Sequence, residues 1–393
     1  AAEVVEILCS IVCSALQHLG SPRMRLICLD MLTQMAPFAP QSAILEEIVP
    51  YCHTLMTDKV AQVRARAIES LPSVLARVDE LPPSDTGLFL DYLFPQLPSA
   101  MSHMGTEMGT EPVVLLAVAR NIGALAQHAL RLAERIADAP PRLGSSSSGV
   151  GEQEPVERGT SEQFGSPLRL PAAALIEATS AAAEAEPYDV VCHRIREAVK
   201  HVVKALLEYG GVGQENTLQA VAIGKEVKIA LLRSMCVLSE TFGRDGTHNF
   251  LLPYLISFMN DPAWEVRAAF CEEAAALPKR VGQVSTEGII WPCYEQALMD
   301  QEERVLQAAL GGLSTLVAQR VLRRQSLTNV ALKVASMLLH PSAVVRERTV
   351  DVLKALGEQL TPVDQCVFLM PTIRPFLQFE LFGVESLDGA LMP

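Results

Sequence analysis

Apolar side chains recur at every third or fourth position along most of the chain, which is the spacing of one face of an α-helix. The first such segment covers 2–19 and stops at Gly20, a residue suited to ending a helix. The pattern also predicts a kink at Pro50 and a final single helix over 363–381. The predicted pairs are 2–19 with 22–36, 44–57 with 60–78, 87–102 with 112–136, 188–209 with 226–242, 250–260 with 262–281, 286–299 with 301–320, and 327–339 with 341–360. This pattern predicts an all-α chain of about seven helix pairs plus a leftover helix.

One short phrase recurs within this pattern at offsets of 39 and 40 residues. It begins with an aspartate or histidine and has a valine five residues later; two copies have a proline after the first residue, and three have an arginine six residues after it. A period of about 40 residues in a helical pattern is typical of HEAT or armadillo repeats, which are stacked pairs of antiparallel helices. We therefore predict an α-solenoid. The residues of the phrase are Asp58, Val63 and Arg64; Asp261, Pro262, Val266 and Arg267; Asp300 and Val305; and His340, Pro341, Val345 and Arg346.

Each position of the phrase has a structural interpretation. Pro262 and Pro341 can occupy the first position of a helix, where a missing N–H is tolerated, and Asp261 can cap that helix. The arginines share one position near the turn, so we predict that they form a structural ladder along one ridge. Trp264 follows the turn and is a possible partner contact, with packing between repeats as the equal alternative.

Residues 138–187 interrupt the helical pattern and divide the repeats into 1–137 and 188–393. The stretch is rich in Pro, Ser, Gly and Glu and low in hydrophobicity, so we predict a disordered insertion. An inert loop is favoured over a regulatory phosphorylation tract. A second, shorter loop is predicted at 210–224. Because the pattern begins and stops within apolar segments, we expect a fragment of a longer protein.

Composition and charge narrow the choice of partners. The 393 residues carry a formal net charge of −13, which argues against a nucleic-acid surface because phosphate contacts need clustered Lys and Arg. The longest basic cluster is Arg320, Arg323 and Arg324, which we interpret as a solvated helix end rather than a site for lipid headgroups or phosphate. No apolar run approaches the roughly 18–20 residues of a transmembrane helix, so none is predicted.

We find no set of residues with the types and spacing of a catalytic or ligand-binding site, and we predict no catalytic, cofactor-binding or metal-binding residue. The nine cysteines lack the spacing of zinc ligands and are interpreted as core residues of a protein from a reducing compartment, the cytosol. Phosphate-binding loops, protein-kinase motifs and nucleophile elbows do not occur in the sequence. The sequence therefore predicts that this segment is not an enzyme.

Several runs of residues resemble a known family. They are Phe242-Gly243-Arg244, Phe258-Met259-Asn260-Asp261, Val266-Arg267-Ala268-Ala269-Phe270, Ile48-Val49-Pro50-Tyr51 and Leu369-Met370-Pro371. With these runs the chain resembles the helical-repeat region of the regulatory subunit of the class III phosphatidylinositol 3-kinase, of the vacuolar-protein-sorting serine/threonine protein kinase family. The likeness covers nearly the whole chain outside 138–187 and 210–224.

The resemblance implies a non-catalytic scaffold in endosomal sorting and autophagy. Its implied partners are the lipid kinase catalytic subunit and a Beclin-like subunit, and its implied place is the cytoplasm, peripheral to endosomal and autophagic membranes through the complex alone. A protein-kinase-like domain would precede these residues and a propeller would follow them. Two alternatives stay open: a scaffold of type 2A-like protein phosphatases, and a segment of a serine/threonine kinase whose catalytic domain lies elsewhere.

Overall fold

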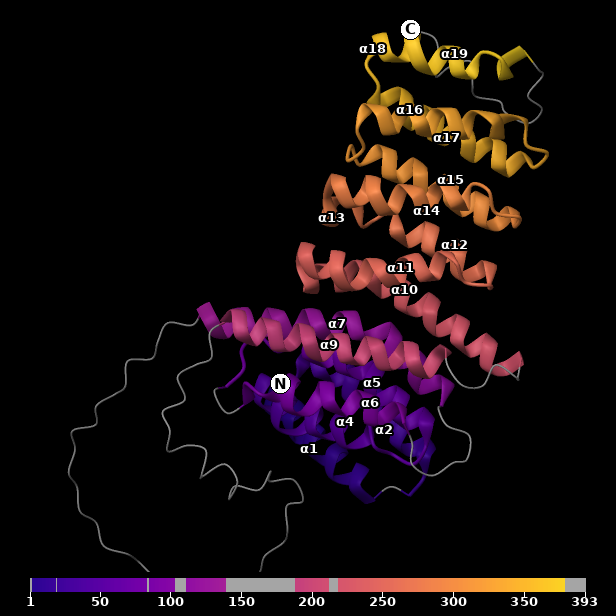
Figure 1. Ribbon diagram of the computed structural model, residues 1–393. Coiled ribbons are helices and arrows are strands. Elements are labelled where there is room, and N and C mark those ends of the chain that lie inside the picture. The colour runs from indigo at the N-terminus through magenta and orange to yellow at the C-terminus, as the bar shows by residue number, and fades with distance from the viewer. Residues whose placement is uncertain are drawn as a thin grey trace, which may run out of the picture.

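The computed structural model describes residues 2–18, 20–82, 85–102, 111–138, 188–211 and 218–378. Within these ranges all regular structure is helical, arranged as seven helix pairs and one further helical segment that stack from α1 to α19 (Figure 1). The first four pairs are α1 (Ala2–His18) with α2 (Pro22–Met35); α3 (Gln41–Ala43), η2 (Ile44–Ile48) and α4 (Val49–Leu55) with α5 (Ala61–Leu75); η4 (Leu88–Leu93) and α6 (Phe94–Met101) with α7 (Pro112–Asp138); and α9 (Tyr188–Gly211) with α10 (Leu218–Gly246).

The remaining pairs continue the stack. They are η5 (Thr247–Leu251) and α11 (Leu252–Met259) with α12 (Trp264–Ala274); α13 (Pro278–Ser285), η6 (Thr286–Ile290) and α14 (Trp291–Ala297) with α15 (Glu303–Ala318); and α16 (Arg324–Ala335) and η7 (Ser336–Leu339) with α17 (Ala343–Gln359). The leftover segment is α18 (Pro362–Asp364), η8 (Gln365–Leu369), α19 (Met370–Ile373) and η9 (Phe376–Gln378). The predicted all-α solenoid is confirmed.

The second helices of the pairs form one continuous layer. Helix α2 packs on α5, α5 on α7, α7 on α10, α10 on α12, α12 on α15, and α15 on α17. The buried apolar side chains of all pairs join into a single core cluster, so each pair gains from its neighbours the burial that a lone pair lacks. The whole described chain is therefore one solenoid.

The first helices share a feature that the sequence pattern did not predict. Four of them, and the leftover segment, contain a π turn, and the second residue after that turn is a proline; the prolines are Pro50, Pro95, Pro253, Pro292 and Pro371. Proline cannot donate to the carbonyl four residues earlier and its ring crowds that carbonyl, and a π turn widens the coil at this point. Where a kink was predicted at Pro50, the structure therefore has a π turn and the helix continues.

The predicted boundaries differ from the structure in two places. The helix predicted over 262–281 ends at Ala274, and α13 begins at Pro278, because Pro is favoured in a first turn; Gly282, with φ of +83°, then breaks α13. The loop predicted over 210–224 is too long, since α9 reaches Gly211 and α10 begins at Leu218. An apolar run from Leu218 extends the helix despite the flanking glycines. Residues 139–187 of the predicted insertion lie outside the described residues.

Helix α7 is long and apolar enough, by length and composition, to cross a membrane. In its most apolar 18-residue window the mean hydropathy is 1.5, and 56% of that window is buried inside the protein. It packs against α5, α9 and α10. These contacts account for its apolar character as a helix of the solenoid core.

Candidate functional site

The turn between α11 and α12 shows how the recurring phrase works. Asp261 accepts a hydrogen bond from the Ala263 backbone N–H (2.9 Å), so the carboxylate stabilises the turn, and Pro262 lies in that turn rather than at the first helical position as predicted. The other oxygen of Asp261 accepts from Nζ of Lys228 (2.6 Å), on α10 of the preceding pair. Arg267 donates from Nη1 to the Asp261 carbonyl (2.8 Å) and to that of Pro262 (3.1 Å). Carbonyls of the turn after α11 thus gain a charged donor from the following helix.

Arg267 also reaches the next pair. Its Nε and Nη2 donate to the two carboxylate oxygens of Asp300 at 2.6 and 3.0 Å, in the two-pronged geometry that suits a guanidinium. Asp300 in turn accepts from the Glu302 backbone N–H (2.9 Å). The bonds from Arg267 hold the pKa of Asp300 below its ordinary value, against the effect of burial. Arg267 therefore bridges two consecutive turns.

The same arrangement occurs in the N-terminal pairs. Asp58 accepts from the Val60 backbone N–H (2.8 Å) and pairs with Arg25 of α2 (3.1 Å). Arg64 is almost fully buried, at 1% exposure, and donates to the carbonyls of Asp58 (2.7 Å) and Ala100 (3.2 Å). The third pair has Ser102 near its turn instead of an aspartate, so Arg64 binds a backbone carbonyl of that pair.

At the last turn the arginine–aspartate bridge between consecutive pairs is missing, because both of its partners are replaced. Leu306 stands where α15 would offer an arginine, and His340 stands where the next turn would offer an aspartate. Arg346 still donates to the carbonyls of His340 (2.7 Å) and Pro341 (2.9 Å). The valines of the phrase lie in the core: Val63, Val266, Val305 and Val345. The structural role of these residues remains a prediction that stability measurements decide.

A second ladder, which sequence reasoning missed, lies at the opposite edge of the stack. Here arginine side chains donate to backbone carbonyls within, or just after, an earlier second helix. Arg131 donates to the carbonyls of Leu75 and Val78 (each 2.9 Å), and Arg280 to that of Cys236 (2.7 Å). Leu75 is the last residue of α5 and Val78 lies just after it, so the Arg131 guanidinium complements the negative end of that helix.

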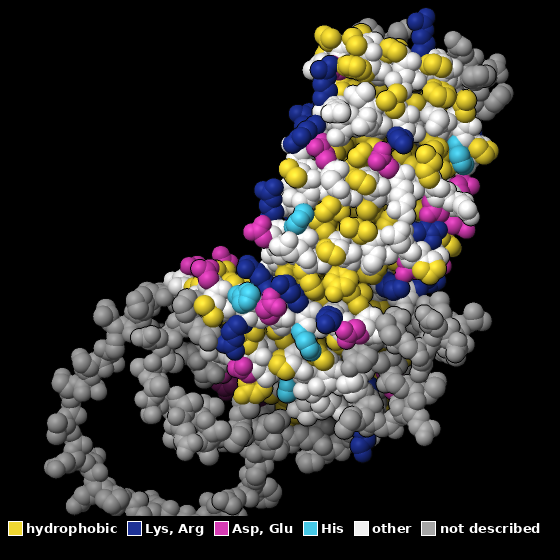
Figure 2. Space-filling model, in the orientation of Figure 1, with side chains coloured by type: hydrophobic (Ala, Val, Ile, Leu, Met, Phe, Trp, Pro, Cys, Tyr) yellow, Lys and Arg dark blue, Asp and Glu magenta, His cyan; other side chains and the backbone are white. Residues whose placement is uncertain are grey.

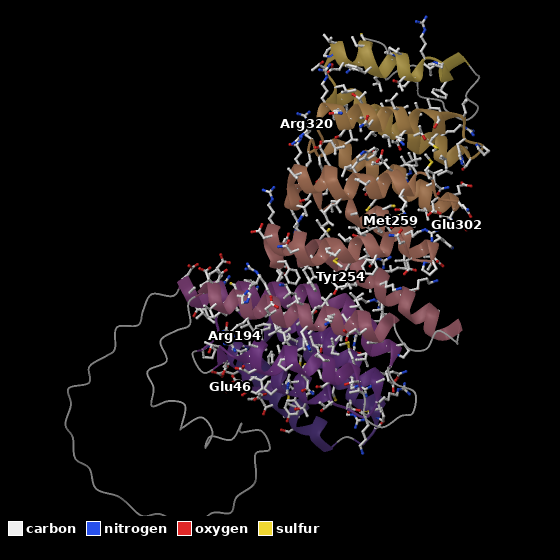
Figure 3. The ribbon with its side chains drawn as sticks, in the orientation of Figure 1. Glu46, Arg194, Tyr254, Met259, Glu302 and Arg320 are labelled. Atoms are coloured by element: carbon white, nitrogen blue, oxygen red, sulfur yellow. The ribbon has the colours of Figure 1, made fainter. Side chains whose placement is uncertain are left out.

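One edge of the C-terminal pairs carries a row of basic side chains (Figure 2). Figure 3 places Arg320 and Glu302 on opposite edges of the upper column, and Figure 2 shows Lys and Arg side chains along the edge that carries Arg320. Part of that charge is paired, because Arg323 contacts Glu287 (3.3 Å) and Arg324 contacts Asp364. Arg320 has a φ of +59°, the left-handed conformation of a residue that ends a helix.

Trp264 begins α12, is partly buried and packs against the core. Its role as a partner contact remains a prediction. Trp291, by contrast, is buried within α14. Among the described residues no group of three or more His, Cys, Asp or Glu side chains is placed to hold a metal ion. All nine cysteines are free thiols, and most of them are buried. Burial raises the pKa of the Cys52 thiol to about 11, which makes it a poor nucleophile.

Among the described residues, the fold therefore brings together side chains that join consecutive pairs, and it leaves other helix faces exposed. A protein-family model described as PIK3R4-like, middle domain, matches residues 8–391. The chain belongs to this family. The PIK3R4-like middle domain thus comprises the whole stack of described pairs from within α1 onward, and the family resemblance found in the sequence is confirmed.

Full-length relatives of this middle domain are named as kinases. The chain is 28% identical over 377 residues to the probable serine/threonine-protein kinase vps15 of Dictyostelium discoideum, covering 95% of this chain and 17% of that protein. It is 28% identical over 396 residues to the serine/threonine-protein kinase VPS15 of Arabidopsis thaliana, covering 99% of this chain and 24% of that protein. The chain thus spans between about a sixth and a quarter of the length of these relatives. The kinase domain of these relatives lies outside the matched stretch.

A solved structure with a similar fold is that of Kap121p. Its crystal structure covers 96% of this chain and 36% of its own, with 13% sequence identity and a TM-score of 0.42. The crystal structure of a charge-reversed Kap121p mutant gives the same identity and TM-score and covers 94% of this chain and 35% of its own.

The Arg267–Asp300 bridge supplies the first testable prediction. In a double-mutant cycle with Arg267→Ala and Asp300→Asn, we expect a coupling free energy of about 1–3 kcal/mol, because both side chains are largely buried. The pKa of Asp300 is lowered in the folded state, so its contribution is present above the unfolded pKa and is lost as pH falls through the folded pKa. Urea unfolding between neutral and acidic pH measures both effects.

The exposed pair Arg348–Asp351 (3.9 Å) on α17 is the control and should couple by less than about 0.5 kcal/mol. Equal coupling in the two pairs, or no loss of the Arg267–Asp300 coupling in acid, would show that the bridge does not stabilise the stack.

Proposed function

We propose that this chain is a non-catalytic scaffold that holds the subunits of a class III phosphatidylinositol 3-kinase complex together for endosomal sorting and autophagy. The observation that carries the proposal is the unbroken stack, in which bonds such as Lys228 to Asp261 and Arg267 to Asp300 join consecutive pairs at their turns. A stack fixed in this way sets the distance and orientation between proteins bound at different pairs. Membership of the PIK3R4-like family supports the choice of complex.

The partners in this proposal are the lipid kinase catalytic subunit and a Beclin-like subunit. The scaffold would act in the cytoplasm, at endosomal and autophagic membranes, and reach the membrane through the complex. The contacts of the Asp…Val-Arg phrase here are those of inter-repeat packing, so the phrase does not favour the phosphatase-scaffold alternative. The relatives named above favour the kinase complex over it.

Co-purification tests this function directly. The full-length parent protein is co-expressed with a class III phosphatidylinositol 3-kinase catalytic subunit and, separately, with a type 2A-like phosphatase catalytic subunit. We expect a stable complex with the lipid kinase and none with the phosphatase. The chain alone should show no ATP turnover. Failure of the full-length protein to bind the lipid kinase, or a stoichiometric complex with the phosphatase instead, would refute the proposal.

A further inference from the structure

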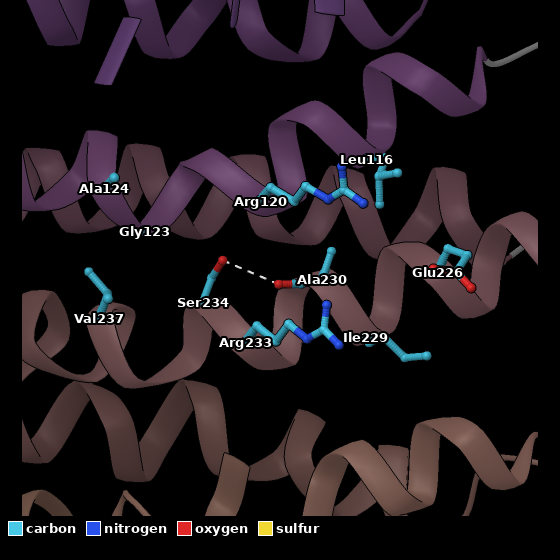
Figure 4. Close-up of a pocket in the computed structure, with 10 residues that line it drawn as sticks. All are labelled: Leu116, Arg120, Gly123, Ala124, Glu226, Ile229, Ala230, Arg233, Ser234 and Val237. Atoms are coloured by element: carbon cyan, nitrogen blue, oxygen red, sulfur yellow. Dashed lines mark hydrogen bonds between the residues drawn. The ribbon is translucent and has the colours of Figure 1, made fainter. Parts of the chain in front are cut away.

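A groove lies between two neighbouring second helices, α7 and α10, near the middle of the stack (Figure 4). Its volume is about 350 Å³. Small residues of both helices form part of its lining, among them Gly123, Ala124, Ala230 and Ser234. The larger side chains Leu116, Ile229 and Val237 add apolar surface. The groove thus combines a hollow made by small residues with apolar walls.

Tight packing of the two helices fixes this shape. A Cβ atom added at Gly123 would lie 3.3 Å from the Ser234 carbonyl oxygen and from Cβ of Val237. Ser234 donates from Oγ to the Ala119 carbonyl of the facing helix (2.8 Å). Because helix α7 meets α10 through small residues, the groove is part of the packed fold and exists before any partner binds.

Two arginines extend over the groove. Figure 4 shows Arg120 of α7 and Arg233 of α10 extending in the same direction along their helices, with Ala230 between them. Both are exposed, and within the described residues neither forms an ion pair. Glu226 lines one end of the groove, and Glu273 lies nearby on α12, where burial raises its pKa and Arg233 lowers it. Two carboxylates therefore lie near the positive region.

The position of these arginines within the repeat is informative. Each stands six residues after the valine of its helix, Val114 or Val227. The equivalent residues of the neighbouring pairs are acidic, Glu69 before them and Glu272 after them. At this position of the repeat, two consecutive pairs carry arginines and the pairs on either side carry glutamates. On a chain of net charge −13, the groove is therefore positively charged where the neighbouring pairs are negatively charged.

We propose that the groove binds an acidic segment of a partner polypeptide, with a carboxylate held between Arg120 and Arg233 and an adjacent apolar side chain against Leu116 and Ile229. Guanidinium groups match carboxylates through paired hydrogen bonds, and the flanking Glu69 and Glu272 repel an acidic segment at the neighbouring pairs. A nucleic acid or an anionic membrane needs a longer run of cations than two arginines bounded by glutamates. The partner rests on the proposed function, since it is a subunit of the complex that the scaffold holds.

Site-specific photocrosslinking identifies the occupant. Benzoylphenylalanine replaces Leu116, or in a second variant Ile229, in the full-length protein purified with its lipid-kinase partners. After irradiation, mass spectrometry is expected to find a partner peptide in which Asp and Glu outnumber Lys and Arg. A crosslinked peptide of neutral or basic composition, or an assembled complex without any partner crosslink, would overturn the proposal.

Charge reversal supplies the quantitative test. The double variant R120E/R233E is expected to weaken partner binding at least tenfold and to flatten its salt dependence, whereas R304E/R348E, two exposed arginines on α15 and α17, leaves both unchanged. Replacing the crosslinked acidic residue of the partner by lysine should restore binding to R120E/R233E. If the wild-type protein binds no lipid kinase, the proposed function fails; if it binds and R120E/R233E binds equally well, the groove assignment alone fails. Matching melting curves confirm that both variants are folded.

Discussion

Arg64→Ala is expected to lower the free energy of unfolding of the N-terminal pairs by about 3–5 kcal/mol. The Arg64 side chain is almost completely buried, and its guanidinium donates to carbonyls of Asp58, Lys59 and Ala100. Alanine leaves these carbonyls without their donor and opens a cavity between the second and third pairs. Urea unfolding monitored by circular dichroism measures the loss, and amide hydrogen exchange locates it in α5, α6 and α7.

Arg66→Ala is the matched control, two residues further along the same helix. Arg66 is 45% exposed and pairs with Asp30 and Glu69 at the surface, so its loss should cost less than about 1 kcal/mol. Equal destabilisation by the two substitutions would mean that burial of Arg64 and its carbonyl contacts do not stabilise the repeats. Exchange that increases evenly along the whole solenoid would contradict the local origin of the effect.

The acceptors of Arg64 and Arg267 show how far the sequence predicts the contacts between repeats. As the recurring phrase indicated, Asp261 and Asp300 occupy equivalent places in successive pairs, where each accepts from the backbone N–H two residues later. The acceptor of each arginine was not predictable from spacing. Arg267 meets an aspartate in the next pair, whereas Arg64 meets the carbonyl of Ala100.

The sequence did not predict the carbonyl contacts at the other edge, for a related reason. Arg131 and Arg280 belong to different helical positions, and their acceptors lie more than 40 residues earlier in the chain. Which carbonyls they reach depends on how the end of one pair is placed against the next. The groove between α7 and α10 has the same origin. Gly123 and Ser234 look like ordinary small residues in the sequence, and only the rotation of both helices brings them face to face.

The prolines illustrate a signal that was present and was interpreted incompletely. Pro50, Pro253 and Pro292 each precede the aspartate of a turn by eight residues, so they are part of the same repeat unit. Pro50 was interpreted as a single kink because one proline within a helix normally interrupts it. Comparison of the repeats with one another, rather than each helix by itself, would have extended the phrase to its first helix.

Gly312→Ala is expected to destabilise the C-terminal pairs by about 3 kcal/mol, while Gly311→Ala, one residue earlier, stabilises them by about 0.5–1 kcal/mol. A Cβ atom at Gly312 would overlap the Cys271 carbonyl oxygen of α12 and come within 2.5 Å of Oη of Tyr294 on α14, which itself donates to that carbonyl. The Tyr294 ring is fully buried and has no free space to move into, so α15 has to shift away from α12. A Cβ at Gly311 meets nothing within 4 Å, and alanine there gains helix propensity without a clash.

Thermal and urea unfolding show whether each substitution stabilises or destabilises the protein, and hydrogen exchange shows which helices are affected. Gly312→Ala should increase exchange in α12, α14 and α15 and leave α5–α7 protected, which is the reverse of the pattern expected for Arg64→Ala. Contacts in a solenoid join neighbouring pairs alone, so damage at one interface spreads to adjacent pairs before it reaches the far end. If Gly311→Ala and Gly312→Ala have the same sign, the close approach of α15 to α12 and α14 is wrong. If Gly312→Ala and Arg64→Ala loosen the same helices, the pairs do not unfold as neighbouring units.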